Sequence, residues 1–371
     1  MTNWVRYWIK TRRFRMMLKT FIITTIISLS LATAVSTGAM FVSRTVVPET
    51  RPMGQVQVFQ ERPFNFNTTN TETTEDDYED EEHELEYIWP APERMTDDDR
   101  RDLFFTFLII GLNEGRNANT IMVGSYDYFT GEANLISIPR DVPVNANRNA
   151  RKLSSSYLAG AGGGRGRDGG VAQVQRDVMN VIGFIPDFYI VIDYDTFFTI
   201  IDAVDGIEIY VPFRFYYCDP WQDLHIDIPA GLQLMDSQTA LHFARFRRAN
   251  RGHRGIDDFQ RVANQQAVIN AVVARLLRPE SLLRIPEYLR IFNESVHTNL
   301  TAGNMAWFAA QLHSARGTDA LSTYTMPISH SSGRPRYYEF LNAQATLELI
   351  NRTVNPFYID IEMRDLDIIS G

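Results

Sequence analysis

One segment near the N-terminus, residues 20–43, constrains this chain more than any other feature. Its sequence, TFIITTIISLSLATAVSTGAMFVS, contains no charged residue and has about the length that a helix needs to cross a bilayer core. Six Lys and Arg residues lie within residues 1–19, whereas only Arg44 and Arg51 follow soon after the segment. The positive-inside bias therefore predicts a cytoplasmic N-terminus, one transmembrane helix over residues 20–43 and an extracytoplasmic remainder. This is the topology of a single-pass type II protein of the cell membrane. A cleaved signal peptide ending near residues 32–34 is the alternative, and it leaves the rest of the chain on the same side.

Residues 44–100 have the composition of a disordered acidic stalk. They are rich in Thr, Asn, Glu, Asp and Pro and show no sustained apolar period, so they cannot bury enough surface to fold. The run TETTEDDYEDEEHELE, residues 71–86, carries much of the net charge of −9, and the rest of the chain is nearly balanced. The net charge therefore says little about the partners of the folded part.

The remainder predicts an α/β domain over residues 101–315, with a C-terminal extension of that domain over residues 316–371. The predicted strands are residues 102–112, 120–126, 133–138, 188–194 and 206–212, and the predicted helices are residues 171–182 and 195–204. Strands that alternate with helices favour an α-β-α sandwich with a mixed central sheet. The run AGAGGGRGRDGG, residues 159–170, lacks the Lys-Ser/Thr ending of a phosphate-binding loop and is interpreted as a flexible loop.

The sequence LISIPRDVPV, residues 135–144, ends a predicted strand at Pro139 and presents Arg140 and Asp141 side by side. A surface ion pair between these two residues would contribute at most about 1 kcal/mol. The second interpretation is that the rigid turn aims the planar guanidinium of Arg140 at an anion, because its geometry matches phosphate oxygens.

Residues 231–279 contain two predicted helices separated by a basic loop. Asp236 or Ser237 can cap the first helix, and Asp257 or Asp258 can cap the second, because each residue stands just before an apolar period.

Four residues of this region predict an anion site. Arg245 and Arg247 are two apart, so an extended segment would project both guanidinium groups from one face. Arg261 and Gln265 are four apart and project from one stripe near a helix N-terminus, which itself favours anions. Together these residues predict a site for a polyanion.

Two other interpretations of the basic residues were considered. Basic clusters bind the phosphate backbone of nucleic acids, but a nucleic acid is excluded here because the domain is predicted to lie outside the membrane. A solvated basic loop accounts for Arg248, Arg251 and Arg254, but it does not account for the spacing of Arg261 and Gln265.

Eight motifs occur in order: FLIIGLN, NTIMVGSYD, LISIPRD, KLSSSY, GIEIYVP, GLQLMDSQTAL, ARFR and DFQRVANQ. With them the chain resembles the LytR-CpsA-Psr family of envelope glycopolymer transferases over roughly residues 103–312, and several ordered motifs are stronger support than one. The resemblance implies a central sheet between helical layers and a tunnel for a polyprenyl chain. It also implies a reaction that moves a glycopolymer, such as a teichoic acid, from a polyprenyl-pyrophosphate carrier to peptidoglycan.

The resemblance further implies roles for individual residues. Arg140 would hold the pyrophosphate, and Asp141 would orient it or a neighbouring arginine. No general base is identifiable from the sequence, and Asp141 is named for that role without a specific signal. The other implied catalytic residues are Arg245, Arg247 and Arg261. The implied substrate-binding residues are Lys152, Gln265, Phe188 and Phe198, of which the two phenylalanines line either the lipid tunnel or the ordinary core.

The chain departs from the family pattern at two positions that would bind Mg²⁺. Where the family has G-x-D and S-D-T, this sequence has GLN ending at Asn113 and ANT centred on Asn119. An amide offers a carbonyl oxygen but no charge, and magnesium near phosphates is usually held by one or two carboxylates. The sequence therefore predicts that Mg²⁺ binding is weakened strongly.

Three functions follow from these observations. The first is a membrane-anchored phosphotransferase, and the second is a divergent, catalytically weak module that binds a polyprenyl-pyrophosphate glycolipid. The third is a structural envelope protein on a stalk, which the convergent arginines disfavour. Metallohydrolase and serine-hydrolase chemistry are disfavoured because the sequence has no H-E-x-x-H and no G-x-S-x-G motif.

Overall fold

A computed structural model describes residues 47–50, 55–57, 86–88, 95–146, 148, 150–162, 164–221, 224–314, 321–329 and 338–369. The predicted transmembrane helix and most of the predicted stalk lie outside these residues. Within them, no helix is both long enough and apolar enough to span a bilayer.

The chain divides into two compact units. The smaller unit comprises Met1–Pro48 and Thr301–Ala310, and helix α10 (Ala302–Ser314) begins in it. The Thr301 hydroxyl accepts the backbone N–H of Asn304 at 3.1 Å, which satisfies a free donor in the first turn of that helix. The larger unit, Glu49–Leu300 with Gln311–Gly371, holds the sheets and the candidate site described below.

A mixed six-stranded sheet forms the centre of the larger unit, in the order β11-β6-β3-β4-β5-β12. Its strands are β3 (Phe104–Leu112), β4 (Ala118–Asp127), β5 (Ala133–Ile138), β6 (Phe188–Ile192), β11 (His297–Thr298) and β12 (Leu321–Thr325). Strands β3, β5, β6 and β12 run in one direction, and β4 and β11 run in the other. The predicted α/β fold with a mixed central sheet is therefore confirmed. The segment after residue 315 contributes β12, an edge strand of the same sheet.

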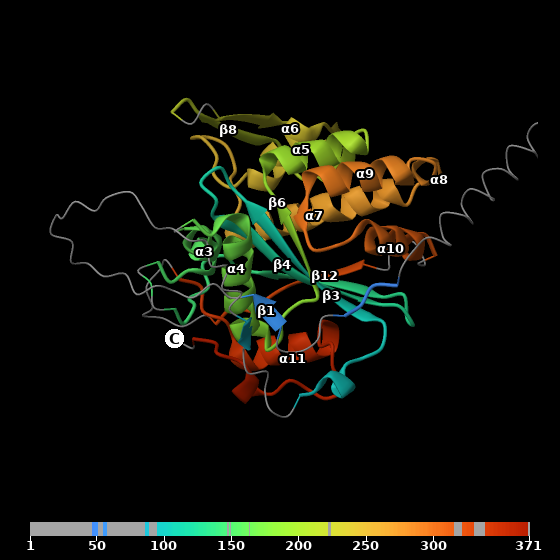
Figure 1. Cartoon of the computed structure of the whole chain (residues 1–371). Coiled ribbons are helices and arrows are strands. Elements are labelled where there is room, and N and C mark those ends of the chain that lie inside the picture. Colours follow the sequence, from blue (N-terminus) through green and yellow to red (C-terminus); the bar gives the residue numbers. More distant parts are fainter. Residues whose placement is uncertain are drawn as a thin grey trace, which may run out of the picture. The chain divides into compact units, whose positions relative to one another are not determined.

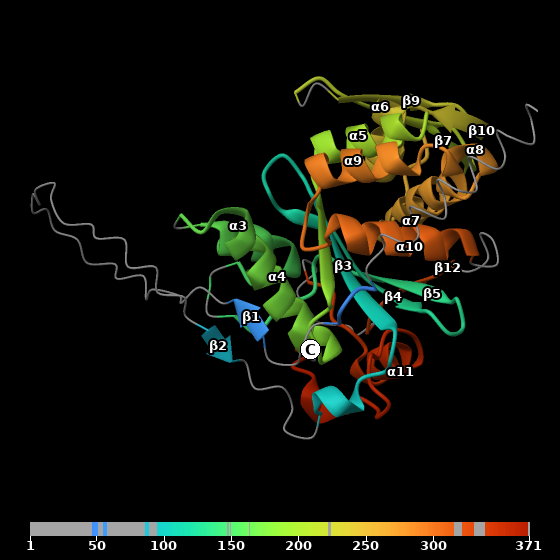
Figure 2. The same ribbon diagram turned by 45° about the vertical axis from the view of Figure 1, so that its right-hand side comes forward.

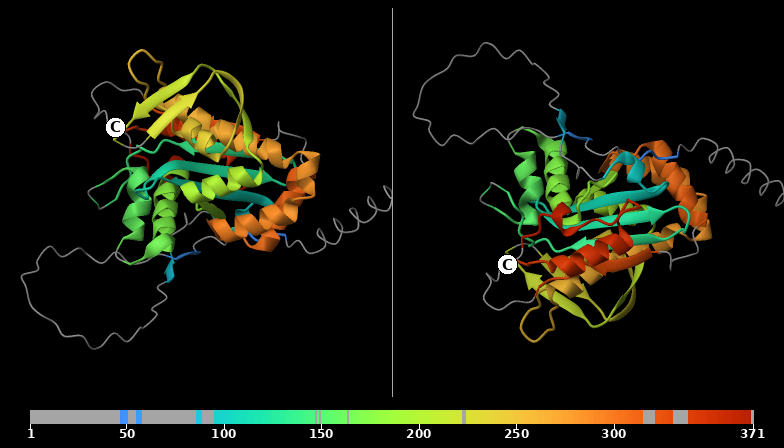
Figure 3. Two further views of the ribbon diagram at one scale, coloured as in Figure 1. Left: turned by 90° about the horizontal axis from the view of Figure 1, so that it is seen from above. Right: turned by 90° about the horizontal axis from the view of Figure 1, so that it is seen from below.

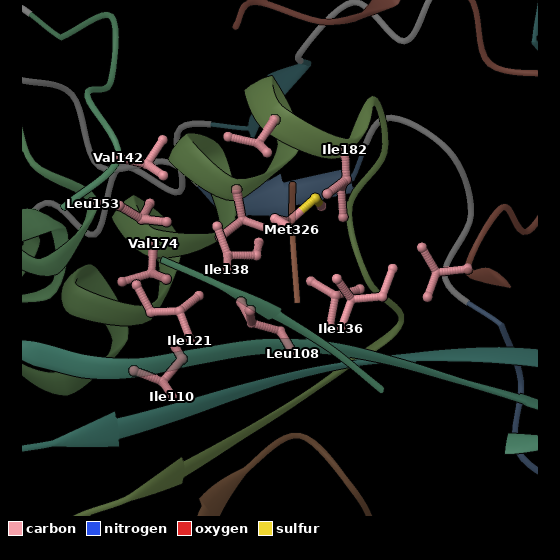
Figure 4. Close-up of a cluster of buried hydrophobic side chains, with 14 of the residues drawn as sticks. Leu108, Ile110, Ile121, Ile136, Ile138, Val142, Leu153, Val174, Ile182 and Met326 are labelled. Carbon is pink, nitrogen blue, oxygen red and sulfur yellow. The ribbon is translucent and has the colours of Figure 1, made fainter. Parts of the chain in front are cut away.

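One face of this sheet carries the main core. Alternate residues of β3, Leu108 and Ile110, are fully buried there, as the two-residue period of a strand requires. They pack with Val174 of helix α4 (Gly166–Ile182), and helix α11 (Ala343–Thr353) contributes Ile350 to the same cluster. Figure 4 shows strand residues of this face meeting side chains of α4.

The opposite face is bound by helix α7 (Asp258–Leu276). Ser137 points away from the main core, and its hydroxyl accepts a hydrogen bond from the Gln266 side chain at 2.9 Å. The same amide donates to the backbone oxygen of Tyr324 in β12 at 2.8 Å, so one side chain ties α7 to two strands. Helices α5 (Tyr194–Ala203), α6 (Ser237–Arg245) and α9 (Ile285–Ser295) gather on this side, and α11 lies on the other (Figures 1 and 2).

A second core lies among α5, α6, α7 and two small antiparallel sheets of two strands each. One sheet pairs β7 (Ile207–Val211) with β10 (Gly231–Met235), and the other is the hairpin of β8 (Phe215–Asp219) with β9 (Leu224–Ile228). The ring of Phe215 stacks on Phe246 at 4.1 Å and on Phe243 at 5.5 Å between ring centroids. The sequence analysis did not predict the β8–β9 hairpin.

The remaining elements are short. They are β1 (Gln55–Gln57), β2 (Glu86–Ile88), α8 (Pro279–Leu282) and the 3-10 helices Asp97–Asp99, Leu153–Ser155 and Met363–Asp365. Strands β1 and β2 pair antiparallel inside the segment for which the composition predicts disorder. The folded part also begins before residue 101, because Met95 is buried in the main core and the buried Arg100 forms an ion pair with Asp187 at 2.7 Å.

The prediction of a flexible glycine-rich loop over residues 159–170 is wrong. Helix α3 (Ser156–Ala161) and helix α4 take up both ends of that run and lie side by side (Figure 3). A Cβ on Gly160 would lie 2.2 Å from the backbone oxygen of Gly169, so the two helices approach as closely as they do only without side chains. The glycines serve helix packing rather than mobility.

This contact yields a prediction about stability. We expect Gly160→Ala to destabilise the protein by about 2 kcal/mol, because overpacking against backbone exceeds the smaller gain in helix propensity. Gly162→Ala is the matched control, since φ there is −68° and the nearest atom to an added Cβ is 3.6 Å away. Denaturant unfolding of both variants measures the difference, and equal stabilities would contradict the close contact.

Candidate functional site

The candidate site lies at the edge of the central sheet where the parallel strands end. Asn113 follows β3, Arg140 follows β5 and Asp193 follows β6, and the carboxyl ends of these strands meet at one edge. The antiparallel β4 begins at the same edge, so Asn119 lies opposite the turn after β5. Ligand sites of open α/β sheets form at this edge.

Three arginines and their carboxylate partners form what we call the basic cluster: Arg140, Arg247, Arg261, Asp141 and Asp258. Asp258 bridges two of the arginines, with Arg261 Nη2 at 2.9 Å from Oδ2 and Arg247 Nε at 3.4 Å from Oδ1. Arg140 donates from Nη1 to Asn119 Oδ1 at 3.2 Å, and its Nε lies 3.9 Å from Asp141 Oδ2. The sequence-predicted Arg140, Arg247 and Arg261 therefore come together in space.

Lys152 joins the basic cluster through Asp141. Its Nζ donates to Asp141 Oδ1 at 2.8 Å and lies 5.7 Å from the centroid of the Tyr338 ring. Asp141 is thus paired with Lys152 more closely than with Arg140, and the adjacent-pair interpretation of the Arg-Asp sequence describes only a weak contact. The Arg140 guanidinium remains directed at the amide of Asn119, which carries no charge.

The basic cluster has donors that its own residues do not satisfy. The Nε atoms of Arg140 and Arg261 are buried and have no hydrogen-bond partner among the described residues. Burial lowers the pKa of the Arg261 guanidinium, and repulsion from Arg140 lowers it further, while Asp258 partly offsets both effects. A buried donor without a partner costs about 1–3 kcal/mol, so an anion that accepted these hydrogen bonds would stabilise the cluster.

A polar pocket of about 670 Å³ lies beside this edge of the sheet. Helix α6 lines it with Gln238, His242 and Arg245, whose spacing of four and three places them on one stripe. The Arg245 guanidinium lies 5.1 Å from the centroid of the Tyr194 ring. Burial lowers the pKa of His242, and the nearby Arg245 lowers it further, so the imidazole is neutral at pH 7.

The remaining lining residues include groups of both charges and one of the predicted phenylalanines. They are Leu112, Asn113, Glu114, Arg116, Tyr157, Arg167, Asp193, Asp195, Phe198, Leu224 and Leu241.

Arg245 and Arg247 face different groups, although the sequence analysis placed them on one face of an extended segment. Arg245 is the last residue of α6, and the next N–H, of Phe246, still donates to the His242 oxygen at 2.9 Å. Phe246 is fully buried in the second core, so the chain turns there. Arg245 consequently lines the pocket and Arg247 reaches Asp258. The extended conformation predicted for Arg245 is wrong.

The start of α7 explains why Asp258 is available to bridge two arginines. Asp257 is the N-cap residue, and its side chain accepts the Gln260 N–H at 2.8 Å, while the Gln260 side chain returns to the Asp257 N–H. Asp258 then stands in the first turn, where a carboxylate is favoured, and Arg261 follows one turn later. The sequence analysis had left the cap open between Asp257 and Asp258.

Two of the predicted substrate-binding residues, Gln265 and Phe188, are not among the residues that line the pocket. Gln265 is half-buried on α7, and the hydrogen bonds of this region go to its neighbour Gln266 instead. Phe188 packs in the sheet against Phe107, with ring centroids 5.6 Å apart. Phe198, in contrast, lines the pocket.

Several residues of this site were not identified from the sequence as site residues. Asp258 was considered only as a cap, and Tyr194 and His242 carry no local signal beyond their helical spacing. Glu339 also lies near the basic cluster, because its backbone N–H donates to the backbone oxygen of Asp141 at 3.1 Å. Only the spacing of Gln238, His242 and Arg245 on one helical stripe could have indicated a shared surface.

The two positions expected to bind Mg²⁺ do not fit that ion. Asn113 Oδ1 accepts the backbone N–H of Asn117 at 2.9 Å, and Asn119 Oδ1 accepts from Arg140. Across the described part of the chain, no group of three or more His, Cys, Asp or Glu side chains is arranged to hold a metal ion. Both amide oxygens are therefore engaged, and neither brings the negative charge that magnesium prefers.

Fold and site together define an α/β protein with a cluster of arginines at the ends of its parallel strands. The LytR_cpsA_psr family model matches residues 64–354, and the chain belongs to that family.

Two similar proteins carry names that describe different functions. Regulatory protein MsrR of Staphylococcus aureus (strain COL) is 22% identical over 239 residues, which are 62% of this chain and 67% of that protein. Polyisoprenyl-teichoic acid–peptidoglycan teichoic acid transferase TagV of Bacillus subtilis (strain 168) is 27% identical over 208 residues, which are 53% of this chain and 50% of that protein. The match to TagV thus spans half of its length.

Solved structures share the fold. The crystal structure of B. subtilis TagV superposes with a TM-score of 0.55 at 22% identity, covering 68% of this chain and 96% of that one. A structure of TagT bound to LIIa-WTA gives a TM-score of 0.54 at 16% identity, covering 70% and 92%.

The bridging role of Asp258 can be tested through stability. Its side chain is 16% exposed and that of Arg261 is 8% exposed, so Asp258→Asn leaves a buried guanidinium without its counter-ion. We expect a loss of about 3 kcal/mol in the free energy of unfolding, because breaking a buried pair exposes the remaining charge to an apolar surrounding. Asp257→Asn is the control, since Asn also caps helices and residue 257 is exposed. Similar unfolding midpoints for the two variants would count against the bridge.

Proposed function

We propose that this chain is a membrane-anchored, extracytoplasmic phosphotransferase that moves a glycopolymer from a polyprenyl-pyrophosphate carrier to peptidoglycan. The observation that carries the proposal is the basic cluster at the strand ends, where ligands bind, because two of its buried Nε donors have no hydrogen-bond partner among the described residues. Membership of the LytR_cpsA_psr family and similarity to the teichoic acid transferase TagV support the general reaction. The membrane anchor is proposed from residues 20–43 and their flanking charges.

The chemistry that this site can supply is positioning and charge neutralisation. Phosphoryl transfer depends mainly on these two effects, because charge is spread over the phosphate oxygens in the transition state. In the proposal Arg140, Arg247 and Arg261 bind the pyrophosphate. The acceptor hydroxyl attacks the sugar-linked phosphorus, and polyprenyl phosphate leaves with the electron pair of the broken P–O bond.

The polar pocket is assigned to the part of the substrate next to the pyrophosphate. Arg245 lines this pocket and is separated from Arg247 by one residue, so one extended ligand can contact both groups. The pocket offers amide, imidazole, hydroxyl and guanidinium groups, which suit the hydroxyl groups of a sugar. Phe198 supplies an apolar contact in the same lining.

A second function is favoured by one specific observation. Asn113 and Asn119 stand where the family pattern has carboxylates, and their oxygens are engaged within the protein. A member that binds the lipid-linked polymer but transfers it poorly would have the same arginines and the same pocket. The two functions are distinguished by measuring whether the protein transfers a lipid-linked substrate that it binds.

The arginines give the first test of the proposal. We expect Arg245→Ala and Arg247→Ala each to weaken binding of a short polyprenyl-pyrophosphate disaccharide by about 30-fold, because each loses a charge-assisted contact of about 2 kcal/mol. Arg251→Ala is the matched control in the exposed basic loop and should change binding less than about twofold. Titration calorimetry measures all three, and equal small losses would favour the solvated basic loop.

The two asparagines give the second test. Because the site does not fit Mg²⁺, transfer of the disaccharide to peptidoglycan fragments should continue in the presence of a chelator. Asn113→Asp with Asn119→Asp adds two carboxylates near Arg140, so binding should weaken in chelator and recover when magnesium is added. Complete loss of wild-type activity in chelator would mean that other residues bind a metal. Intact lipid binding without any transfer would favour the binding module.

A further inference from the structure

The proposed reaction needs a group that takes the proton of the acceptor hydroxyl, and the basic cluster is the place where one can be sought. Asp141 is paired with Lys152 at 2.8 Å, and Asp258 is paired with Arg261 at 2.9 Å. Both carboxylates therefore already have a cationic partner within the cluster. A third carboxyl group lies against the same cluster.

That group belongs to Glu339, whose backbone is fixed against the turn that presents Arg140. The Glu339 backbone N–H donates to the Asp141 backbone oxygen at 3.1 Å. On the next residue, the Phe340 oxygen accepts the Ser329 N–H at 2.7 Å, and Leu341 forms an antiparallel bridge with Ile328. Backbone contacts on three successive residues hold this segment in place, so Glu339 is not on a free loop.

The Glu339 side chain is half-buried and, unlike the other two carboxylates, has no ion-pair partner among the described residues. The charged groups that act electrostatically on its carboxyl are Arg140 and Asp141 from the turn after β5, and Asp258 and Arg261 from the start of α7. Lys152 stands under the neighbouring Tyr338 ring and pairs with Asp141. In the described part of the chain, the Glu339 carboxyl makes no hydrogen bond and no ion pair.

The surroundings favour the protonated form of this carboxyl more than is usual. Burial raises the pKa of Glu339, and repulsion from Asp258 and Asp141 raises it further, although Arg140 and Arg261 act in the opposite direction. A general base is most effective when its pKa approaches the working pH. A bound pyrophosphate would add negative charge beside Glu339 and move its pKa further in the same direction.

We infer that Glu339 is the general base of the proposed transfer and contacts the acceptor hydroxyl beside the pyrophosphate. In this step the hydroxyl oxygen forms a bond to the sugar-linked phosphorus, and its proton passes to the Glu339 carboxylate. The P–O bond to polyprenyl phosphate breaks, and that group leaves with the bonding electron pair. The proton then passes from Glu339 to water. The inference rests on the proposed function, since it assigns the proton transfer within that reaction.

The test compares Glu339→Gln with the wild-type chain in the transfer of a short polyprenyl-pyrophosphate disaccharide to peptidoglycan fragments. We expect kcat to fall by about 10² to 10⁴-fold, the range typical of a lost general base. The acidic limb of the pH–kcat profile should disappear with it. Glu348→Gln is the matched control, because Glu348 is exposed on α11 and its side chain accepts a hydrogen bond from Gln344.

Two further readouts separate a base from a structural residue. Binding of the same disaccharide should be unchanged or tighter in Glu339→Gln, because a negative charge beside the arginines is removed. A carboxyl whose pKa is higher in the folded than in the unfolded state lowers the stability as the pH rises from the unfolded pKa to the folded pKa, because the unfolded chain ionises more readily. The Glu339→Gln variant should therefore be at least as stable as wild type at neutral pH. Loss of both binding and stability would overturn the assignment in favour of a structural role.

The remaining outcomes distinguish the inference from the proposed function. An active wild-type chain whose Glu339→Gln variant keeps its kcat and its acidic limb would overturn the base and leave the transferase proposal standing. A wild-type chain that binds the disaccharide but never transfers it would overturn both. Glu339→Asp retains the carboxylate one methylene further away, and partial activity in it with the acidic limb preserved would support the base.

Discussion

Asp258 lies between Arg247 and Arg261 and keeps both guanidinium groups at the edge of the sheet. Bringing several like charges out of water costs several kcal/mol for each charge unless an opposite charge accompanies them. Asp258 supplies one such charge. Its side chain is available for this because Asp257, the residue before it, occupies the N-cap position of α7. One carboxylate thus holds two cations and leaves the basic cluster with an excess of positive charge, which is the property an anion site requires.

The sheet determines where this charge is collected. Parallel strands β3, β5 and β6 deliver Asn113, Arg140 and Asp193 to one edge, and α7 is held over the same sheet by Gln266. Because Gln266 contacts both β5 and β12, a strand from the C-terminal segment contributes to the position of Arg261 on the same helix. The geometry of the site therefore depends on contacts between segments that are distant in the sequence, and the rigid sheet and helix transmit these contacts.

Sequence reasoning recovered the elements with strong local signals. The strand 133–138 was predicted with its observed bounds, and the apolar run at 102–112 was recognised because its determinants lie within one strand. Each helix start was narrowed to two candidate caps, Asp236 or Ser237 and Asp257 or Asp258, of which the structure uses Asp236 and Asp257. The glycine-rich run was misread because its reason is tertiary, a contact between two helices. The divergence of Arg245 and Arg247 depends on the burial of Phe246 against Phe215, which no local pattern reports. Glu339 reaches the site through a hydrogen bond from its backbone N–H to the Asp141 backbone oxygen. The two residues are nearly two hundred positions apart in the sequence, so no local pattern reports this contact.

The amide at residue 119 fits this arrangement in a way that a carboxylate would not. Asn119 satisfies one Arg140 donor at 3.2 Å and leaves the charge of that arginine intact. A carboxylate in its place would form an ion pair with Arg140 and cancel the charge that an anion would otherwise use, unless a cation were bound there as well. An amide therefore orients Arg140 without neutralising it, so that the positive charge of the basic cluster does not depend on a metal ion. Under the proposed function the pyrophosphate would be the counter-ion of this cluster, and its binding would relieve the mutual repulsion of Arg140 and Arg261.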